Sequence, residues 1–97
     1  TTAHAAFEEA HRRDPNAHAL FGAGLSLIQL GRLDEAERAF REVLVLDPAY
    51  WQAWGNLAGI YEQQGEVAKA TEAYRHVLEQ NPRDERALAW VRKYGSP

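Results

Sequence analysis

Residues 51–82 read WQAWGNLAGIYEQQGEVAKATEAYRHVLEQNP and contain two helical patterns. The first pattern places apolar residues at i, i+3, i+4 and i+7, which is one face of a helix: Trp54, Leu57, Ala58 and Tyr61. The second pattern has helical spacing in the same way: Ala70, Tyr74, Val77 and Leu78. Gly65 follows the first pattern and Pro82 follows the second, and both residue types end helices. We therefore expect two helices that form one unit, at 51–64 and 67–80.

The same unit occurs once more, 34 residues earlier in the chain. Gly31 and Gly65 are 34 positions apart, and so are Pro48 and Pro82. Apolar residues recur at the same distance in the pairs Leu20/Trp54, Leu27/Tyr61, Ala36/Ala70, Phe40/Tyr74, Val43/Val77 and Leu44/Leu78. A period of this length indicates a repeat architecture, in which each unit buries its apolar face against its neighbours.

The segments outside these two units carry parts of the same pattern. Near the N-terminus, four residues are spaced like those of the second helix of a unit: Ala3, Phe7, Ala10 and Pro15. We therefore expect a further helix at 2–13. Residues 85–97 begin like a first helix, but Arg92 stands where a small residue would admit a partner helix. We expect a helix at 84–94 that caps the stack with a polar outer face.

These residues resemble the signature of the tetratricopeptide repeat family. The second unit carries most of it, in Trp54, Leu57, Tyr61, Ala70, Tyr74 and Pro82, with Ala58 where the family often has Gly. The first unit keeps Gly24 there but departs elsewhere, with Leu20, Ala23 and Leu27 in place of Trp, Leu and Tyr. The resemblance implies an all-α fold, a right-handed α-α superhelix of helical hairpins with about six helices.

The organisation that follows is a single domain over residues 1–97. It comprises a half repeat at 2–16, full repeats at 17–50 and 51–84, and a capping helix at 85–95. The helices are expected at 2–13, 17–30, 33–46, 51–64, 67–80 and 84–94. An alternative is that the chain is a piece of a longer repeat array, in which case part of the function belongs to sequence outside it.

Composition narrows the classes of function. The formal net charge of −3 and the pI of about 5.8 disfavour nucleic-acid binding, which normally uses a basic face. The chain has no cysteine, which excludes disulfides and thiolate metal sites. No apolar run approaches the roughly 20 residues of a membrane span, so we expect a soluble protein, cytoplasmic rather than periplasmic. The basic residues are mostly arginine, which is typical of GC-rich bacterial sources.

No catalytic or cofactor-binding pattern stands out in the sequence. His4 and His11 share a helix face but are two turns apart, too far to bind one metal ion. His18 and His76 are isolated from them and from each other. The glycines within 17–30 and 51–64 are not arranged as a phosphate-binding loop. We therefore expect no enzyme activity, no cofactor and no metal.

The family resemblance also indicates where a partner would bind. In tetratricopeptide repeat proteins the first helices line a concave groove and the second helices form the convex back. We therefore expect a protein or peptide to bind in a groove formed by 17–30, 51–64 and 84–94. The expected groove residues are Phe21, Leu25, Ile28, Gly55, Asn56, Gly59, Arg86 and Trp90.

Two features of these helices bear on the expected groove. Phe21, Leu25 and Ile28 form a second apolar stripe, which packs against neighbouring helices, forms the floor of the groove, or contacts sequence upstream of this chain. Gly55 and Gly59 each cost about 1 kcal/mol relative to Ala in a helix interior. One explanation for two such glycines is that a ligand backbone approaches the helix closely. The alternative is neutral drift at surface positions that tolerate glycine.

Some tetratricopeptide domains hold a C-terminal carboxylate with a clamp of lysine, arginine and asparagine side chains. Asn56 and Arg86 occupy two of the matching positions. The other three positions hold Phe21, Leu25 and Trp90. These departures predict a more apolar ligand, with one acidic group near Arg86 and Lys93.

Two functions from different classes are consistent with the pattern. The first is a non-enzymatic scaffold that binds a peptide or protein segment in the concave groove. The alternative is a self-associating structural module, a homo-oligomer formed through helix 2–13. That helix lacks the first helix that would normally cover it, and exposed apolar surface of this kind marks interfaces.

Overall fold

The computed structural model describes residues 15–95, which form five α-helices and, within that range, no strand. They are α2 (Pro15–Gln29), α3 (Leu33–Leu46), α4 (Trp51–Gln63), α5 (Val67–Gln80) and α6 (Glu85–Tyr94). Each helix begins and ends within two residues of the range expected from the sequence. The expected helix at 2–13 lies outside the described residues.

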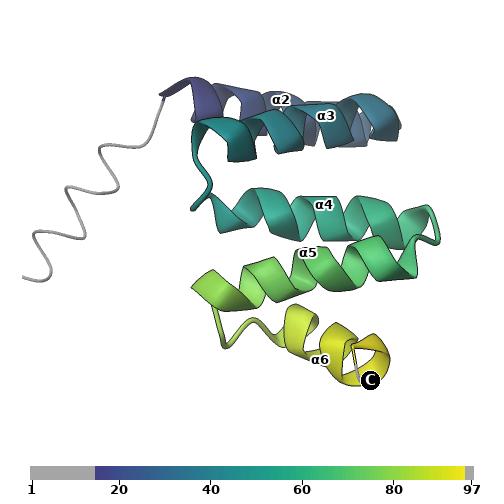
Figure 1. Ribbon diagram of the computed structural model, residues 1–97. Coiled ribbons are helices and arrows are strands. Elements are labelled where there is room, and N and C mark those ends of the chain that lie inside the picture. Colours follow the sequence, from purple (N-terminus) through teal and green to yellow (C-terminus); the bar gives the residue numbers. More distant parts are fainter. Residues whose placement is uncertain (1–14, 96–97) are drawn as a thin grey trace, which may run out of the picture.

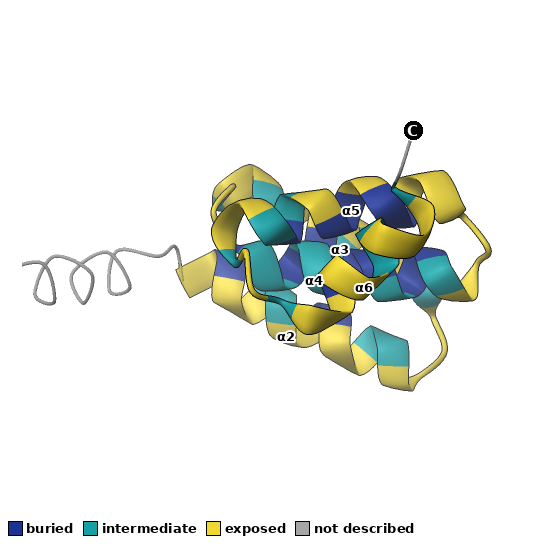
Figure 2. Cartoon of the chain, turned by 90° about the horizontal axis from the view of Figure 1, so that it is seen from below, coloured by how far each residue is buried: buried dark blue, intermediate teal, exposed yellow. Residues whose placement is uncertain are grey.

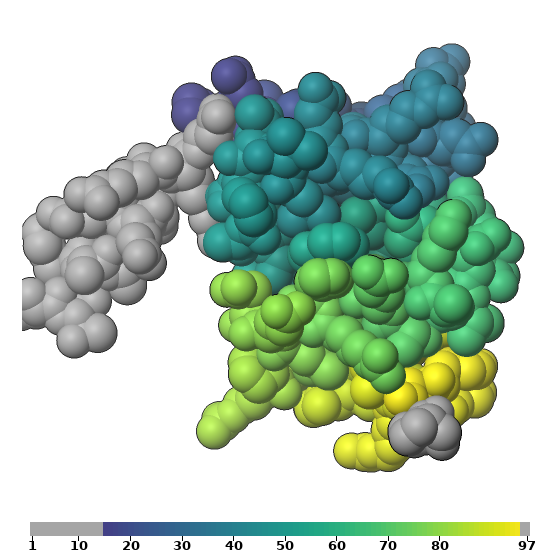
Figure 3. Space-filling model, viewed as in Figure 1, coloured from purple at the N-terminus to yellow at the C-terminus, as the bar shows by residue number. Residues whose placement is uncertain are grey.

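The helices pair into hairpins that stack along one direction (Figure 1). The first hairpin is α2 with α3, the second is α4 with α5, and α6 packs on α5 at the end of the stack. Packing is more extensive within each hairpin than between α3 and α4. In the space-filling view the two hairpins and α6 form adjoining layers (Figure 3).

Glycine residues end the first helix of each hairpin. Gly31 and Gly65 have φ angles of 77° and 75°, in the left-handed region that glycine adopts without strain. The N–H of Glu66 donates to the carbonyl of Tyr61 at 2.8 Å, and the turn after α2 is closed in the same way. These turns fold the second helix of each pair back against the first.

The core lies between the facing sides of the helices. Its largest fully buried side chains are Tyr74, Phe40, Leu57, Ile60, Val43 and Val77. The small signature residues Ala36, Ala58 and Ala70 are also fully buried, which allows close helix approach. Figure 2 shows buried residues facing the inside of the stack and exposed residues on its outer turns.

Gly24 is the point of close contact between α2 and α3. A Cβ atom at Gly24 would lie 2.7 Å from two ring carbons of Phe40, well inside van der Waals contact. Because Phe40 is itself fully buried, its ring has no free space to move into. This contact is the physical reason for the small residue that the sequence shows at this position.

The rest of this face of α2 is less buried than its counterpart in the second unit. Leu27 is half-buried and Ala23 is exposed, whereas their equivalents Tyr61 and Leu57 are buried. The expected helix 2–13 would precede α2 in the repeat pattern. Self-association through that helix stays a prediction, since the helix lies outside the described residues.

Candidate functional site

A hollow of about 290 Å³ opens between α4, α5 and the start of α6. It is lined by Trp51, Gln52, Gly55, Asn56, Tyr74, Val77, Asp84 and Arg86. Three of the expected site residues, Gly55, Asn56 and Arg86, therefore come together here, and Gly59 lies beside Arg86. We call this hollow the α4–α6 groove.

Gly55 lines the groove, and Gly59 lies next to Arg86, one of its lining residues. A Cβ atom at Gly55 would lie 3.9 Å from the Val77 side chain, and one at Gly59 would lie 3.9 Å from the Arg86 guanidinium. Both distances are ordinary van der Waals contacts, so neither position needs glycine for packing within the chain. Internal packing therefore does not explain two helix-interior glycines, each of which costs about 1 kcal/mol relative to Ala.

Two amide side chains on α4 line the groove wall. Asn56 Nδ2 donates to the backbone carbonyl of Gln52, one turn earlier, at 2.9 Å. That bond uses the donor end of the amide and leaves Oδ1 as an acceptor for a ligand. Gln52 Oε1 is buried and has no hydrogen-bond partner within the described part of the chain. Of these two amide oxygens, Asn56 Oδ1 is the one that the α4 wall offers to a ligand, because Gln52 Oε1 is shielded from solvent.

Arg86 already has a carboxylate partner in the structure. Its Nη2 donates to Glu62 Oε2 at 3.0 Å, and the Tyr74 hydroxyl donates to the same oxygen. The three side chains come from α6, α4 and α5, so they join all three helices around the groove. The carboxylate of Glu62 balances the charge of Arg86.

Trp90 and Asp84 position α6 on the stack. Trp90 is half-buried, its Nε1 donates to Thr71 Oγ1 at 2.9 Å, and its ring centroid lies 5.6 Å from that of Tyr74. The Asp84 carboxylate accepts from the Ala87 N–H at 2.9 Å and caps the first turn of α6. Trp90, expected in the groove, is thus an anchor between α6 and α5.

The three expected site residues of α2 do not line the α4–α6 groove. The Phe21 ring lies edge-on to Phe40, with centroids 5.5 Å apart, and 5.0 Å from the Tyr50 ring. Ile28 is half-buried against the core, whereas Leu25 is 39% exposed. Phe21 and Ile28 therefore pack against neighbouring helices, which is one of the interpretations of the apolar stripe, while Leu25 stays accessible.

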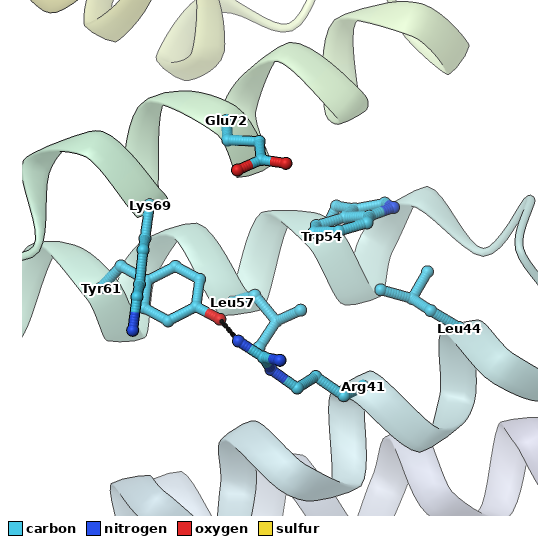
Figure 4. A pocket seen from close by; sticks show the side chains of 7 residues that line it. All are labelled: Arg41, Leu44, Trp54, Leu57, Tyr61, Lys69 and Glu72. Atoms are coloured by element: carbon cyan, nitrogen blue, oxygen red, sulfur yellow. Dashed lines mark hydrogen bonds between the residues drawn. The ribbon is translucent and has the colours of Figure 1, made fainter.

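A larger hollow, of about 420 Å³, lies between α3, α4 and α5 (Figure 4). It is lined by Arg41, Leu44, Trp54, Leu57, Tyr61, Lys69 and Glu72. The Trp54 ring stacks on His76, with centroids 4.0 Å apart and an interplanar angle of 11°. The sequence gives no sign of this hollow, because Trp54 and its apolar neighbours match repeat positions that pack between helices. We call it the Trp54 hollow.

A polar triad of Tyr61, Glu37 and Arg41 adjoins the Trp54 hollow, and Figure 4 shows its Tyr61 and Arg41 side chains with the hydrogen bond between them. The Tyr61 hydroxyl donates to Glu37 Oε2 at 2.9 Å and accepts from Arg41 Nη2 at 2.9 Å. Arg41 and Glu37 also form an ion pair at 3.0 Å. Both tyrosine hydroxyls of the second repeat, Tyr61 and Tyr74, therefore bond to a carboxylate that is itself paired with an arginine.

Because the pKa values of Tyr61 and Tyr74 are raised in the folded chain, we expect the fold to lose stability at high pH. Burial raises the pKa of Tyr74, and its hydrogen bond to Glu62 raises it further. Burial also raises the pKa of Tyr61; the hydrogen bond from Arg41 opposes this and the one to Glu37 adds to it. In the unfolded chain both phenols ionise near about pH 10. The contribution of these two phenols to the free energy of unfolding is complete below that pH. It is lost as the pH rises through the higher pKa values of the folded state.

Urea unfolding at about pH 8 and about pH 11 measures this contribution. We expect the wild-type free energy of unfolding to fall between the two, and to fall less in the variant carrying Tyr61→Phe and Tyr74→Phe. Phe40 occupies the equivalent of Tyr74 in the first repeat, so the substituted ring should fit. The same pH dependence in both proteins would show that the two phenols do not cause the loss.

The described histidines contact aromatic or acidic side chains. His18 Nδ1 lies 3.1 Å from a tyrosine hydroxyl, and His76 Nδ1 lies 2.9 Å from a glutamate oxygen. Within residues 15–95, no cluster of three or more His, Asp or Glu side chains is arranged to hold a metal ion. His4 and His11 lie outside that range. None of the helices in this part of the chain is long and apolar enough to cross a membrane.

Comparisons with known proteins point to one family. The tetratricopeptide repeat family matches two overlapping segments, residues 1–50 and 23–85. Cilia- and flagella-associated protein 70 of Homo sapiens is 29% identical over 85 residues, covering 88% of this chain and 8% of that protein. TPR repeat-containing protein YvcD of Bacillus subtilis is 38% identical over 63 residues, covering 65% of this chain and 13% of that protein.

A chloroplast relative extends the comparison to plants. Tetratricopeptide repeat domain-containing protein PYG7 of Arabidopsis thaliana is 34% identical over 55 residues, covering 57% of this chain and 18% of that protein. The chain thus spans less than a fifth of the length of each of these relatives. Because they come from an animal, a bacterium and a plant, a bacterial origin stays a prediction.

The family match and the helical hairpins of the structure both indicate the same repeat architecture. The matched segments cover most of the chain, and each of the two hairpins contains the small, aromatic and proline residues of the repeat pattern. Proteins of this family generally mediate protein–protein interaction and are generally not enzymes. The chain belongs to the tetratricopeptide repeat family.

Proposed function

We propose that this chain is a non-enzymatic scaffold that binds a peptide or protein segment in the α4–α6 groove. The observation that carries the proposal is the pair of helix-interior glycines, Gly55 and Gly59. Gly55 lines the groove and Gly59 lies beside its lining residue Arg86, and internal packing does not require glycine at either position. Asn56 Oδ1 supplies an acceptor for a ligand N–H, and Arg86 frames the opposite wall.

We further propose that the described hairpins belong to a right-handed α-α superhelix, with α2, α4 and α6 on its concave side. The exposed side chain of Leu25 on α2 then extends the binding surface beyond the groove. Phe21 and Ile28 pack against the core and Trp90 bonds to α5, so these three residues hold the helices of this surface in place. On this arrangement residues 1–97 form one domain, with half and full repeats as the sequence predicts.

The expected affinity is modest. The groove is small, at about 290 Å³, so it engages a short segment of the partner. The ordering of that segment and of the contacting side chains opposes binding. We therefore expect dissociation constants on the order of micromolar rather than nanomolar. The net charge of −3 supports a protein partner over a nucleic acid.

Substitution of Asn56 tests the proposal. Fragments that bind the immobilised wild-type chain are selected from the proteome of the source organism and titrated against variants. Asn56→Ala should weaken binding about three- to tenfold, because one net hydrogen bond contributes about 0.5–1.5 kcal/mol. Helicity should persist, since alanine favours helix.

Lys69→Ala serves as the matched control. Lys69 lines the Trp54 hollow and does not line the α4–α6 groove. Its substitution should leave the affinity of the selected fragments unchanged. Fragments that lose affinity with Lys69→Ala and keep it with Asn56→Ala would place binding at the Trp54 hollow and contradict the proposal.

A further inference from the structure

We propose that the α4–α6 groove receives a basic side chain, lysine or arginine, of the bound segment, between Trp51 and Asp84. This inference rests on the proposed function and names the chemistry of its ligand. It follows from three properties of the groove lining: the supply of hydrogen-bond acceptors, the balance of charge, and an aromatic wall.

Two polar side chains of the groove lining, Asp84 and Asn56, each offer an acceptor oxygen to a ligand. One Asp84 oxygen accepts from the backbone of α6, and the other has no partner among residues 15–95. Asn56 Oδ1 is left over from the bond that its amide donates to the backbone carbonyl of Gln52. A ligand that satisfies these oxygens must bring N–H groups, which a lysine ammonium or an arginine guanidinium supplies in excess.

The charges around the groove favour a cation. Arg86 is paired with Glu62 at 3.0 Å and also lies next to the bonded Tyr74 hydroxyl, so its charge is balanced within the chain. When Glu62 is counted with its partner Arg86, the carboxylate of Asp84 makes the charge around the groove negative. An acidic ligand group would have to compete with Glu62 for Arg86 and would lie near the Asp84 carboxylate. A basic group meets the carboxylate of Asp84 without displacing any contact.

The apolar part of the lining suits the stem of a long basic side chain. Trp51 is half-buried and is the apolar lining residue with accessible surface, whereas Val77 and Tyr74 line the hollow but are almost fully buried. Lysine and arginine lay their methylene stems along apolar surface while the charged head stays polar. A cation near an indole face is also attracted to it. Gly55 adds no side chain that would narrow the entrance beside Val77.

The test uses a display library of random peptides selected on the whole chain. We expect the selected peptides to share a lysine or arginine at one position, and its replacement by glutamate to abolish most of the binding. Asp84→Asn should weaken binding about two- to fivefold, as expected for loss of one partly exposed charge pair. Asparagine caps helices as well as aspartate does, so the thermal melting of this variant should match the wild type.

Glu85→Gln is the matched control for Asp84→Asn. Glu85 is the next residue, is exposed, and does not line the groove, so its substitution removes the same charge without altering the hollow. It should change the affinity much less than Asp84→Asn. Added salt should weaken the binding of the basic peptides, since ions screen the attraction.

Two contrary results are distinguishable. Peptides that need Asn56 but carry no basic residue, or that respond equally to Asp84→Asn and Glu85→Gln, would overturn this inference and leave groove binding intact. Peptides that ignore Asn56→Ala and instead need Lys69, or a library that yields no groove-binding peptide, would contradict both this inference and the proposed function.

Discussion

Replacement of Gly24 by leucine is expected to destabilise the fold by about 1–3 kcal/mol or more. Even the Cβ atom of the new side chain would lie 2.7 Å from the Phe40 ring. Phe40 is fully buried, so relief requires α2 and α3 to move apart and to lose contacts on both sides. Urea unfolding followed by circular dichroism should show a lower midpoint with a similar slope.

Gly22→Ala is the matched control for Gly24→Leu. Gly22 lies on the same helix, and a Cβ atom there would meet nothing within 4 Å. This variant should be more stable than the wild type by about 0.5–1 kcal/mol, the usual gain of alanine over glycine inside a helix. Ala70, fully buried in the second hairpin, should tolerate leucine no better than Gly24. Unchanged melts for both leucine variants would show that the assigned helix packing is wrong.

The combination of Gly55→Ala with Gly59→Ala should make the fold more stable and the binding weaker. Each alanine should add about 0.5–1 kcal/mol to the free energy of unfolding. Both new methyl groups fit, since their nearest neighbours lie 3.9 Å away. The same methyl groups narrow the groove where a ligand backbone is proposed to approach. We expect the affinity for a selected fragment to fall at least tenfold, which is about 1.4 kcal/mol.

A gain in stability together with a loss of affinity would show that Gly55 and Gly59 serve binding. A purely structural role for the glycines predicts no loss of affinity. Isothermal titration reports the affinity, and urea unfolding reports the stability of the same variant. Gly22→Ala again serves as control, because it should raise stability and leave binding unchanged. If the double variant is more stable and still binds like the wild type, Gly55 and Gly59 are tolerated surface glycines without a role in recognition.

The helices could be predicted from the sequence because local rules determine where they end. Gly31 and Gly65 take left-handed conformations at the ends of α2 and α4, as glycine past a helix commonly does. Pro48 and Pro82 follow α3 and α5 for an equally local reason. The 34-residue period then allows the same helix boundaries to be predicted in the first unit, which has lost several signature residues.

The contacts between helices could not be read in the same way. Phe21 packs between Phe40 and Tyr50, a result of the crossing of α2 and α3 rather than of helix periodicity. Glu62 and Arg86 meet across 24 residues, and nothing in their local sequence marks them as a pair. The acidic ligand group expected near Arg86 follows from Arg86 considered alone. The basic ligand proposed for the groove follows from the pair.

The groove itself was only partly visible in the sequence. Gly55 and Asn56 stand out by residue type and repeat position, and the structure places them in one hollow. Asp84 is recognisable in the sequence only as a helix cap, and Gln52 as an ordinary helical residue. Their place beside Asn56 depends on how α6 packs against α5, which a repeat pattern does not specify.

The most direct test of groove binding is a map of the bound surface by nuclear magnetic resonance. A selected fragment is titrated into the isotope-labelled wild-type chain, and the backbone amide shifts are followed. We expect the largest shift changes at Gly55, Asn56 and Gly59, with smaller ones along α6. Largest changes at Arg41 and Lys69, with the groove amides unmoved, would contradict groove binding and make the Trp54 hollow the working surface.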